Sequence, residues 1–413
     1  MQVQLDASLQ DRDDAREAAD ILRSCVHCGF CSATCPTYQI FGDELDGPRG
    51  RISLIQQVLE GRQPTARTRL HLDRCLTCRA CETTCPSGVA YGALLDTGRA
   101  IVDERLPRSP LQRLGRTLLA AWLTGPLFAA SVAAGRLLRG LLPQGLRASL
   151  LRRQSPGAWP AQTHARRVLL LAGCVQPALS PAINAATARV LDALGIEVLV
   201  PPAAGCCGAL RHHLDEQAGA LDDIRRNIDA WWPCVEAGAE AIVFNASGCG
   251  TLLHDYGRLL RADLAYADKA AHVSLLARDA AQVIAPFAAQ IAAHVAQRSS
   301  AGPPRRVVFH PPCSQQHGLK IRGVVESVLG AAGAELLPFA DAHLCCGSAG
   351  TYSLLQPATS RALRERKLAA LQAPSPQLIL SANIGCISQL SGDATPPVRH
   401  WIEWLDEQMG LGR

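Results

Sequence analysis

Eight of the chain's 17 cysteines stand in two runs that share one spacing. The runs are Cys25-Val-His-Cys28-Gly-Phe-Cys31-Ser-Ala-Thr-Cys35-Pro36 and Cys75-Leu-Thr-Cys78-Arg-Ala-Cys81-Glu-Thr-Thr-Cys85-Pro86. Three thiolates at three-residue intervals fit a tight loop around one corner of a metal–sulfur cube, and a distant fourth cysteine supplies the remaining iron with a ligand. The spacing is typical of 4Fe–4S ligands, and eight thiolates make two full sets.

We expect the two runs to exchange their last cysteines, so that each cluster takes three ligands from one run and one from the other. The predicted sets are Cys25, Cys28, Cys31 and Cys85 for one cluster, and Cys75, Cys78, Cys81 and Cys35 for the other. A structural zinc site is the alternative for a Cys-x-x-Cys pair, but zinc requires neither the third cysteine of the loop nor the Cys-Pro ending. A disulfide framework is typical of small secreted chains and fits less well.

Length and composition indicate a multidomain intracellular protein. At 413 residues with 48% hydrophobic residues, the chain can form about three domains with buried cores. The first residues, Met1-Gln-Val-Gln-Leu-Asp6, and the acidic stretch 11–17 lack the basic and then apolar order of a signal peptide. We therefore expect a cytoplasmic protein whose reduced thiols bind metal.

The net charge of +5 is unevenly distributed along the chain. Between Arg105 and Leu191 there are twelve arginines and no acidic residue. Such a block predicts a docking face for an anionic membrane or an acidic partner, and a solvated basic connector is the alternative. We expect no nucleic-acid partner, because the block has neither interleaved aromatic residues nor a recognition motif.

An uncharged stretch of nineteen residues, Thr117–Gly135, lies inside this block. About 18 apolar residues can span a bilayer, but Pro126 interrupts this stretch and six of its residues are alanines. We therefore expect two short helices broken at Pro126, followed by Arg136, Arg139 and Arg147 at an interface, rather than a transmembrane span. The sequence predicts peripheral attachment to the inner face of the cell membrane.

From Arg166 onward the sequence is a duplicate. Each copy reads as a strand, a cysteine, a helix, a strand, a Cys-Cys-Gly sequence and a further strand followed by another cysteine. The offset between the copies is 139 for three cysteines and 137 for the fourth, which indicates an internal repeat of two α/β units. The matched cysteines are Cys174, Cys206, Cys207 and Cys249 in the first copy and Cys313, Cys345, Cys346 and Cys386 in the second.

These patterns predict an α+β multidomain fold. Helices between the two cysteine runs favour an α-helical ferredoxin domain with two 4Fe–4S clusters, and two duplicated α/β Cys-Cys-Gly domains follow it. The predicted boundaries are 1–103 for the ferredoxin-type domain, 104–165 for a basic helical connector, 166–298 for the first Cys-Cys-Gly domain and 304–413 for the second.

The repeated cysteines should meet at one edge of each sheet, where α/β folds gather their sites. We predict a further cluster or ligand site there, and the alternative is a tight, buried turn with inert thiols. His310 and His317 flank the first cysteine of the second copy, and His212 and His213 follow the first Cys-Cys-Gly. Such histidines could contact a ligand, although lone histidines are more often satisfied core or surface residues. Cys234 has no counterpart and is expected in the core.

The sequence contains no Ser-His-Asp arrangement that stands out, no His-Glu-x-x-His motif and no dinucleotide-binding fingerprint. We therefore predict no catalytic residues in this chain. Two clusters form a relay for single electrons, and the substrate chemistry would need a partner whose flavin collects two electrons. FAD is expected on partner subunits only.

Longer strings resemble the iron–sulfur subunits of bacterial glycolate oxidase. Examples are Gly42-Asp-Glu-Leu-Asp-Gly-Pro-Arg-Gly-Arg51, Leu72-Asp-Arg-Cys-Leu-Thr-Cys-Arg79, His343-Leu-Cys-Cys-Gly-Ser-Ala-Gly-Thr-Tyr352 and Val398-Arg-His-Trp-Ile402. The resemblance covers nearly the whole chain and is least distinctive over 105–165. It implies two FAD-binding subunits, one of which oxidises glycolate to glyoxylate, and a relay through this chain to a membrane acceptor, quinone. It also implies that the eight N-terminal cysteines are the cluster ligands.

The duplicated part resembles the Cys-Cys-Gly domains of heterodisulfide reductases, whose units commonly end in Cys-x-x-Cys. Ala246 and Asn383 stand at the first position of that pair, so we predict two clusters and leave a third iron–sulfur site open. The alternatives are an iron–sulfur subunit of an anaerobic glycerol-3-phosphate or lactate dehydrogenase, or, in another class, a non-catalytic iron–sulfur sensor. A sensor would require a nucleic-acid-binding module, which the sequence does not display.

Overall fold

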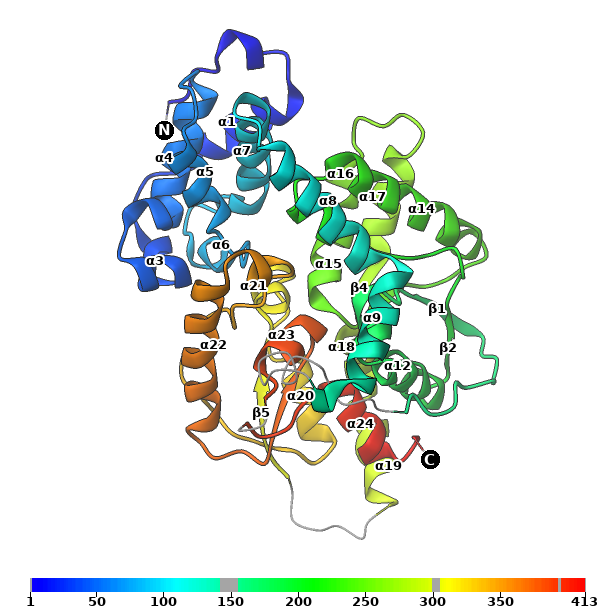
Figure 1. Ribbon diagram of the computed structural model, residues 1–413. Helices are drawn as coiled ribbons and strands as arrows, with labels where there is room; N and C mark the ends of the chain where they lie inside the picture. Colours follow the sequence, from blue (N-terminus) through cyan, green and yellow to red (C-terminus); the bar gives the residue numbers. More distant parts are fainter. Residues whose placement is uncertain (1, 142–154, 299–304, 393–394, 413) are drawn as a thin grey trace.

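The computed structural model describes residues 2–141, 155–298, 305–392 and 395–412. A helical N-terminal domain lies beside two sheet-containing units, and a bent helix pair leads from the first to the second part (Figure 1). The observed architecture confirms the predicted α+β multidomain class. The boundaries at 103, 165 and 304 stay a prediction, and parts of the predicted connector and of the segment between the units lie outside the described residues.

The N-terminal domain is helical, with its cysteine runs in the loops before and after two short helices. Its helices are α1 (Asp13–Arg23), α2 (Phe30–Ala33), α3 (Pro36–Phe41), α4 (Pro48–Leu59), α5 (Ala66–Asp73), α6 (Ala80–Thr84) and α7 (Tyr91–Arg105). Helices α1, α4 and α7 bury Leu22, Ile55 and Leu94 completely in one core. Helix α4 begins at Pro48, because proline at the first helical position has the required φ and loses no hydrogen bond.

The bent helix pair consists of α8 (Pro110–Thr124) and α9 (Pro126–Leu137), which meet at an angle of 75°. The break falls at Pro126, as predicted, because proline cannot continue the hydrogen bonding of α8. Within the described part of the chain no single helix has the length and apolar character needed to cross a membrane, and this pair meets those criteria only when its two helices are joined. Arg147, predicted to follow at an interface, lies outside the described residues.

The first unit holds a parallel sheet with helices on both sides. Its elements are β1 (Arg166–Leu170), α11 (Val175–Leu179), α12 (Ala182–Ala193), β2 (Ile196–Leu199), α13 (Ala209–His213), α14 (Gln217–Glu236), β3 (Ile242–Phe244), α15 (Ser247–His254), α16 (Tyr256–Leu259), α17 (Ala267–Leu276), β4 (Ala277–Asp279), α18 (Ala280–Ile284) and α19 (Ala288–Ala296).

The second unit repeats this plan with fewer helices. Its elements are β5 (Arg306–His310), the short π-helical turn η5 (Ser314–Gly318), α20 (Val324–Ala331), β6 (Glu335–Leu336), α21 (Tyr352–Leu355), α22 (Pro357–Gln372), β7 (Leu378–Ser381), α23 (Ile384–Leu390), β8 (Val398–His400) and α24 (Trp401–Met409).

Both sheets have the same strand order, β2-β1-β3-β4 in the first unit and β6-β5-β7-β8 in the second, with all pairs parallel. Their central strands β3 and β7 are buried along their whole length and mostly aliphatic, as expected for parallel strands covered on both faces. The common order confirms the duplication. The edge strands β4 and β8, three residues each, were not predicted, because such short runs carry no recognisable alternation.

The two units share a core. Helices α12 and α24 pack together, and one cluster of buried side chains joins Ile183 of α12 to Trp401 and Trp404 of α24. Arg189 of α12 makes a two-pronged ion pair with Asp406 of α24, with N–O distances of 2.9 and 2.7 Å. This shared core fixes the carboxyl ends of the two sheets relative to each other.

Candidate iron–sulfur centres

The structure brings the first three cysteines of run one together with the last cysteine of run two. Cys25, Cys28, Cys31 and Cys85 line one small hollow in the N-terminal domain, which Cys81 also borders. Cys85 ends α6 in extended conformation, and the proline that follows turns the chain away. These thiols therefore lie in the exchanged arrangement that the spacing predicts. Their binding of a cluster stays a prediction.

The complementary four thiols line a second hollow. Cys75, Cys78 and Cys81 lie around it together with Cys35, which caps the N-terminus of α3. The donor set is made of sulfur, which suits iron–sulfur clusters. Each hollow therefore offers the number and type of ligands that one 4Fe–4S cluster requires.

The two cysteine loops fold alike. The middle cysteine of each loop is flanked by two residues with positive φ: His27 and Gly29 at 53° and 82° in the first loop, and Thr77 and Arg79 at 53° and 57° in the second. Left-handed residues on both sides of a cysteine curl the chain into a concave loop. Both loops are thus bent to hold three sulfurs around one object.

Burial raises the pKa of three of these thiols, Cys31, Cys78 and Cys81. The pKa of Cys31 is raised to about 11 by burial and by the charge of Cys25. Burial raises the pKa of Cys78 and Cys81 well above the usual range for a thiol. Thiolates are the forms that bind metal, so these positions need nearby positive charge to be deprotonated, which cluster iron supplies on binding.

A buried arginine provides part of that charge. Arg51, with 1% of its side chain exposed, lies at the second hollow. Burial lowers its pKa, but the charges of Cys75, Cys35 and Asp46 outweigh that effect and hold the pKa above its usual value. Arg51 therefore stays cationic beside the second thiol set.

Arg51 belongs to a network that sequence reasoning missed. The fully buried Asp46 accepts hydrogen bonds from Arg51 at 3.4 Å and Arg74 at 2.9 Å and contacts His71 Nδ1 at 3.1 Å. Arg74 directly precedes Cys75, so the network braces the second cysteine loop. Its signal in the sequence is the string 42–51, which contains both Asp46 and Arg51.

In the first unit the four matched cysteines form a continuous chain of contacts. Cys174 hydrogen bonds to Cys206, Cys206 to Cys207 and Cys207 to Cys249. Hydrogen bonds from its two neighbours hold the pKa of Cys206 well below its usual value. Tyr256 donates to the carbonyl of Cys207 at 2.8 Å and fixes the Cys-Cys-Gly turn.

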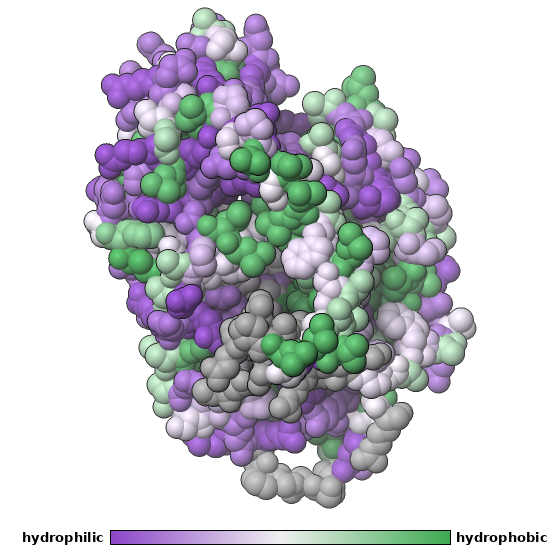
Figure 2. All heavy atoms as spheres, in the orientation of Figure 1, coloured by the Kyte–Doolittle hydropathy of each residue, from purple (hydrophilic) through white to green (hydrophobic). Residues whose placement is uncertain are grey.

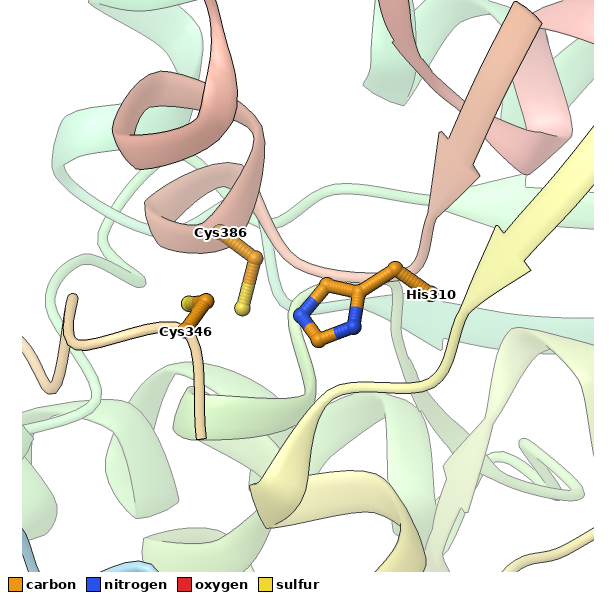
Figure 3. Close-up of side chains that lie close together, drawn as sticks. All are labelled: His310, Cys346 and Cys386. Atoms are coloured by element: carbon orange, nitrogen blue, oxygen red, sulfur yellow. The ribbon is translucent and has the colours of Figure 1, made fainter. Parts of the chain in front are cut away.

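In the second unit the matched cysteines form the same series of contacts, from Cys313 to Cys345, Cys346 and Cys386. Sγ of Cys313 lies 3.6 Å from Sγ of Cys345. Cys346 and Cys386 also lie with His310 at the end of β5 (Figure 3). The other histidine of this region, His317, contacts Thr83 and the carbonyl of His343.

One cavity of about 400 Å³ connects the cysteine edges of both units. The predicted gathering of these cysteines at sheet edges is thus what the structure displays, and the two edges also face each other. The cavity is lined by Cys78 of the N-terminal domain and by Cys174, Cys207, Cys249, Cys313, Cys345, Cys346 and Cys386. Cys234 lies outside this cavity and packs half-buried against the core of the first unit.

The second thiol set of the N-terminal domain adjoins the second unit. Cys78 and Cys313 pack against one buried group formed by Leu76, Cys345 and Tyr352. The Tyr352 hydroxyl donates to the carbonyl of Arg74 at 3.1 Å. Contacts across this boundary place the thiols of the Cys-Cys-Gly turn next to the ferredoxin-type loop.

The first unit meets the N-terminal domain through ion pairs instead. Arg79 contacts Asp255 at 2.7 Å, and Asp96 of α7 contacts His212 at 3.2 Å and Arg258 at 3.4 Å. His212 is therefore paired with a carboxylate, and this satisfied state is usual for a lone histidine.

Comparison with protein families agrees with this arrangement. Residues 21–89 match the family described as the 4Fe–4S dicluster domain, and residues 168–254 and 307–391 match the cysteine-rich domain. Fold and thiol sets thus define an iron–sulfur protein in which a dicluster domain precedes two cysteine-rich domains.

Relatives of full length narrow this class. The chain is 49% identical over 411 residues to the glycolate oxidase iron–sulfur subunit of Escherichia coli K12, with 99% of each chain covered. It is 29% identical to the probable glycolate oxidase iron–sulfur subunit of Bacillus subtilis 168, covering 94% of this chain and 91% of the relative. The chain belongs to the family of glycolate oxidase iron–sulfur subunits, which confirms the resemblance found in the sequence.

A more distant match covers part of the chain. Lactate utilization protein A of an Exiguobacterium strain is 25% identical over 228 residues, which is 54% of this chain and 89% of the relative.

Proposed function

We propose that this chain is the electron-transfer subunit of a complex that oxidises glycolate to glyoxylate on an FAD-binding partner. The pairing of two four-thiol hollows with 49% identity to a glycolate oxidase iron–sulfur subunit carries the proposal. Cys25, Cys28, Cys31 and Cys85 hold one 4Fe–4S cluster, and Cys75, Cys78, Cys81 and Cys35 hold the other. The clusters supply one-electron transfer, and the chain itself carries no catalytic residue.

The surroundings of the two hollows support a direction for the relay. Cys28 is exposed, and the adjacent Val26 and Phe30 are 68% and 62% exposed. An apolar rim around an exposed cluster suits docking of the two FAD-binding subunits. The second hollow leads toward the second unit through Cys78, and from there the electrons reach a membrane acceptor, which we propose to be quinone.

The bent helix pair supports attachment to the membrane surface. Leu111, Leu118 and Leu127 are 81%, 58% and 69% exposed, and hydrophobic side chains gather over this face of the molecule (Figure 2). The surrounding block contains twelve arginines without an acidic residue. Exposed apolar side chains within an arginine-rich block suit the interface of an anionic bilayer, so we place the chain peripherally on its cytoplasmic side.

Membrane washing tests this attachment. Membranes that contain the complex are extracted with alkaline carbonate, which removes peripheral proteins. We expect the chain in the supernatant, and the double variant Leu111→Ser/Leu118→Ser should weaken binding before the wash. A chain that stays in the pellet would overturn peripheral attachment.

The eight repeated cysteines were predicted to offer a further site, and we propose that the first unit provides it. Cys174, Cys206, Cys207 and Cys249 form one connected set of thiols beside the cavity. A set of four thiols without a competing ligand fits a third iron–sulfur site.

The relay is tested with Cys28→Ser in the complex with its FAD-binding partners. We expect glycolate-dependent reduction of a dye that accepts electrons from the clusters to fall to background, while flavin content and flavin reduction by glycolate are retained. Cys234→Ser, which changes a cysteine outside the thiol sets, should keep full activity. Unchanged dye reduction by Cys28→Ser would contradict the relay.

A lactate-oxidising complex is the second candidate, favoured by the match to lactate utilization protein A. The lower identity and partial coverage of this match make the lactate-oxidising complex the weaker candidate. Purification of the chain with its natural partners discriminates between them: flavoproteins that are reduced by glycolate support the first candidate, and reduction by lactate alone supports the second.

A further inference from the structure

Three metal-binding side chains meet at the carboxyl end of the second sheet. His310 ends β5, Cys346 lies in the Cys-Cys-Gly turn and Cys386 lies in the first turn of α23. One ligand atom from each lies within 4.8 Å of the other two. Figure 3 shows the imidazole of His310 with one nitrogen turned toward the two sulfur atoms.

The imidazole of His310 is buried without a hydrogen-bond partner. It is 0% exposed, and neither ring nitrogen has a partner among the described residues. An unpartnered buried polar group costs roughly 1–3 kcal/mol. The buried His400 does not have this deficit, since its Nε2 contacts the carbonyl of Asn245 at 2.8 Å and its Nδ1 accepts from the backbone of Ile402. The lack of a hydrogen-bond partner for the buried ring of His310 indicates that a ligand binds the lone pair of one ring nitrogen.

The size of the group selects the kind of ligand. Zinc binds imidazole nitrogen at about 2.0–2.1 Å and thiolate sulfur at about 2.3 Å, so its ligand atoms lie less than about 4 Å apart. A 4Fe–4S cluster places each thiolate on a different iron and spreads the sulfurs further. Among the residues that the structure describes, no other group containing cysteine is as compact as this one. The group therefore fits a single ion better than a cube.

A hydrogen-bond donor beside the group also suits a bound thiolate. Asn383 Nδ2 donates to Sγ of Cys386 at 3.6 Å, a contact that stabilises a thiolate. Thus Asn383, which stands where related domains have a cysteine, serves the remaining sulfur as a hydrogen-bond donor. The first unit has Leu171 at the position of His310 in the repeat, so it lacks the imidazole.

We propose that His310, Cys346 and Cys386 bind one thiophilic divalent cation of the zinc class. This site goes beyond the proposed electron transfer and does not depend on it. The ion links β5, the Cys-Cys-Gly turn and α23, and thereby holds the edge of the second unit that faces the N-terminal domain. Cys346 and Cys386 also line the cavity, so a small ligand from the cavity completes the coordination of the ion.

Metal analysis of the full-length chain, purified anaerobically, tests the site. We expect about one zinc per chain in addition to iron. His310→Ala and Cys386→Ser should lose the zinc and keep their iron and the cluster EPR signals. Cys249→Ser, the counterpart of Cys386 in the first unit, should keep the zinc.

X-ray absorption at the zinc edge separates a built site from adventitious zinc. The wild type should show two sulfur neighbours and at least one nitrogen, and His310→Cys should retain zinc with a third sulfur neighbour. Wild-type protein without zinc, a His310→Ala variant that keeps it, or one that loses iron instead would each overturn the proposal. Loss of the cluster signals in the wild type would instead count against the proposed relay, so the two failures are distinguishable.

Discussion

The two Cys-Cys-Gly units share strand order and cysteine positions but differ at the residue three places before the first cysteine. That residue is Leu171 in the first unit and His310 in the second. In the first unit the four thiols contact one another in sequence. The second unit has the same series of thiol contacts, and its Cys346 and Cys386 also lie with the imidazole of His310. One substitution in a repeated frame thus adds an imidazole to two of the same four cysteines.

The units also differ in how they meet the N-terminal domain. The first unit uses charged pairs such as Asp96 with His212. The second uses packed sulfur and aromatic groups, with Cys78 beside Cys345 and Tyr352. Charged pairs can position a domain, whereas close packing of thiols next to a predicted cluster ligand suits electron transfer. This difference supports our proposal that electrons leave the N-terminal domain through the second unit.

The largest expected effect is at the sulfur contact. Cys78→Ser removes a predicted ligand at the boundary with the second unit, so iron should fall by about four atoms per chain and glycolate-dependent turnover should fall to background. Iron analysis, EPR and dye reduction measure this outcome. A variant with full iron content and full turnover would show that this contact is not part of the relay.

The two Cys-Cys-Gly turns offer a matched pair of glycine substitutions. Gly208 and Gly347 have φ values of +91° and +88°, a region that L-residues rarely adopt. A Cβ on Gly347 would lie 2.6 Å from the carbonyl oxygen of Ser360, whereas on Gly208 it would lie 3.0 Å from that of Ala220.

We therefore expect Gly347→Ala to cost about 3–5 kcal/mol, from left-handed strain plus a backbone clash, and Gly208→Ala about 1–2 kcal/mol. Thermal unfolding under anaerobic conditions, with zinc and iron content measured in parallel, shows which of the two variants loses more stability. Equal losses in both variants would mean that the tighter packing around Gly347 has no energetic consequence.

The sequence predicted those parts of the site that depend on local spacing. The cysteine runs identified the two thiol sets, the offset identified the repeat, and Pro126 identified the helix break. It did not predict that Thr83 would contact His317 or that Asp46 would meet Arg51 and Arg74, because such contacts depend on how separate elements pack. The sequence placed His310 beside Cys313, where it could contact a ligand, but only the burial of its ring and the approach of α23 show that it lies with Cys346 and Cys386.

The smallest expected effect is a pH dependence at the charged contact of the first unit. Burial lowers the pKa of His212, but the charge of Asp96 outweighs this and raises it overall. Burial raises the pKa of Asp96, but His212 and Arg258 lower it below its usual value. The stabilisation from His212 is therefore complete below its unfolded pKa of about 6.5 and is lost as the pH rises through its raised folded pKa. The stabilisation from Asp96 is present above its unfolded pKa of about 3.9 and is lost as the pH falls through its lowered folded pKa.

Wild-type protein should accordingly lose thermal stability between pH 6 and pH 8.5 through this contact. Asp96→Asn should cost roughly 1.5–3 kcal/mol at pH 6, the worth of a hydrogen bond to a charged group, and should flatten the pH dependence. Tyr352→Phe is the matched control, because burial raises the pKa of that hydroxyl and keeps it protonated over the whole range. It should lower stability at the second unit's contact while retaining the wild-type slope. If the thermal stability of Asp96→Asn depended on pH as steeply as that of the wild type, the titrating group would lie elsewhere. The contrast between a charged contact at the first unit and a packed contact at the second would then lose its support.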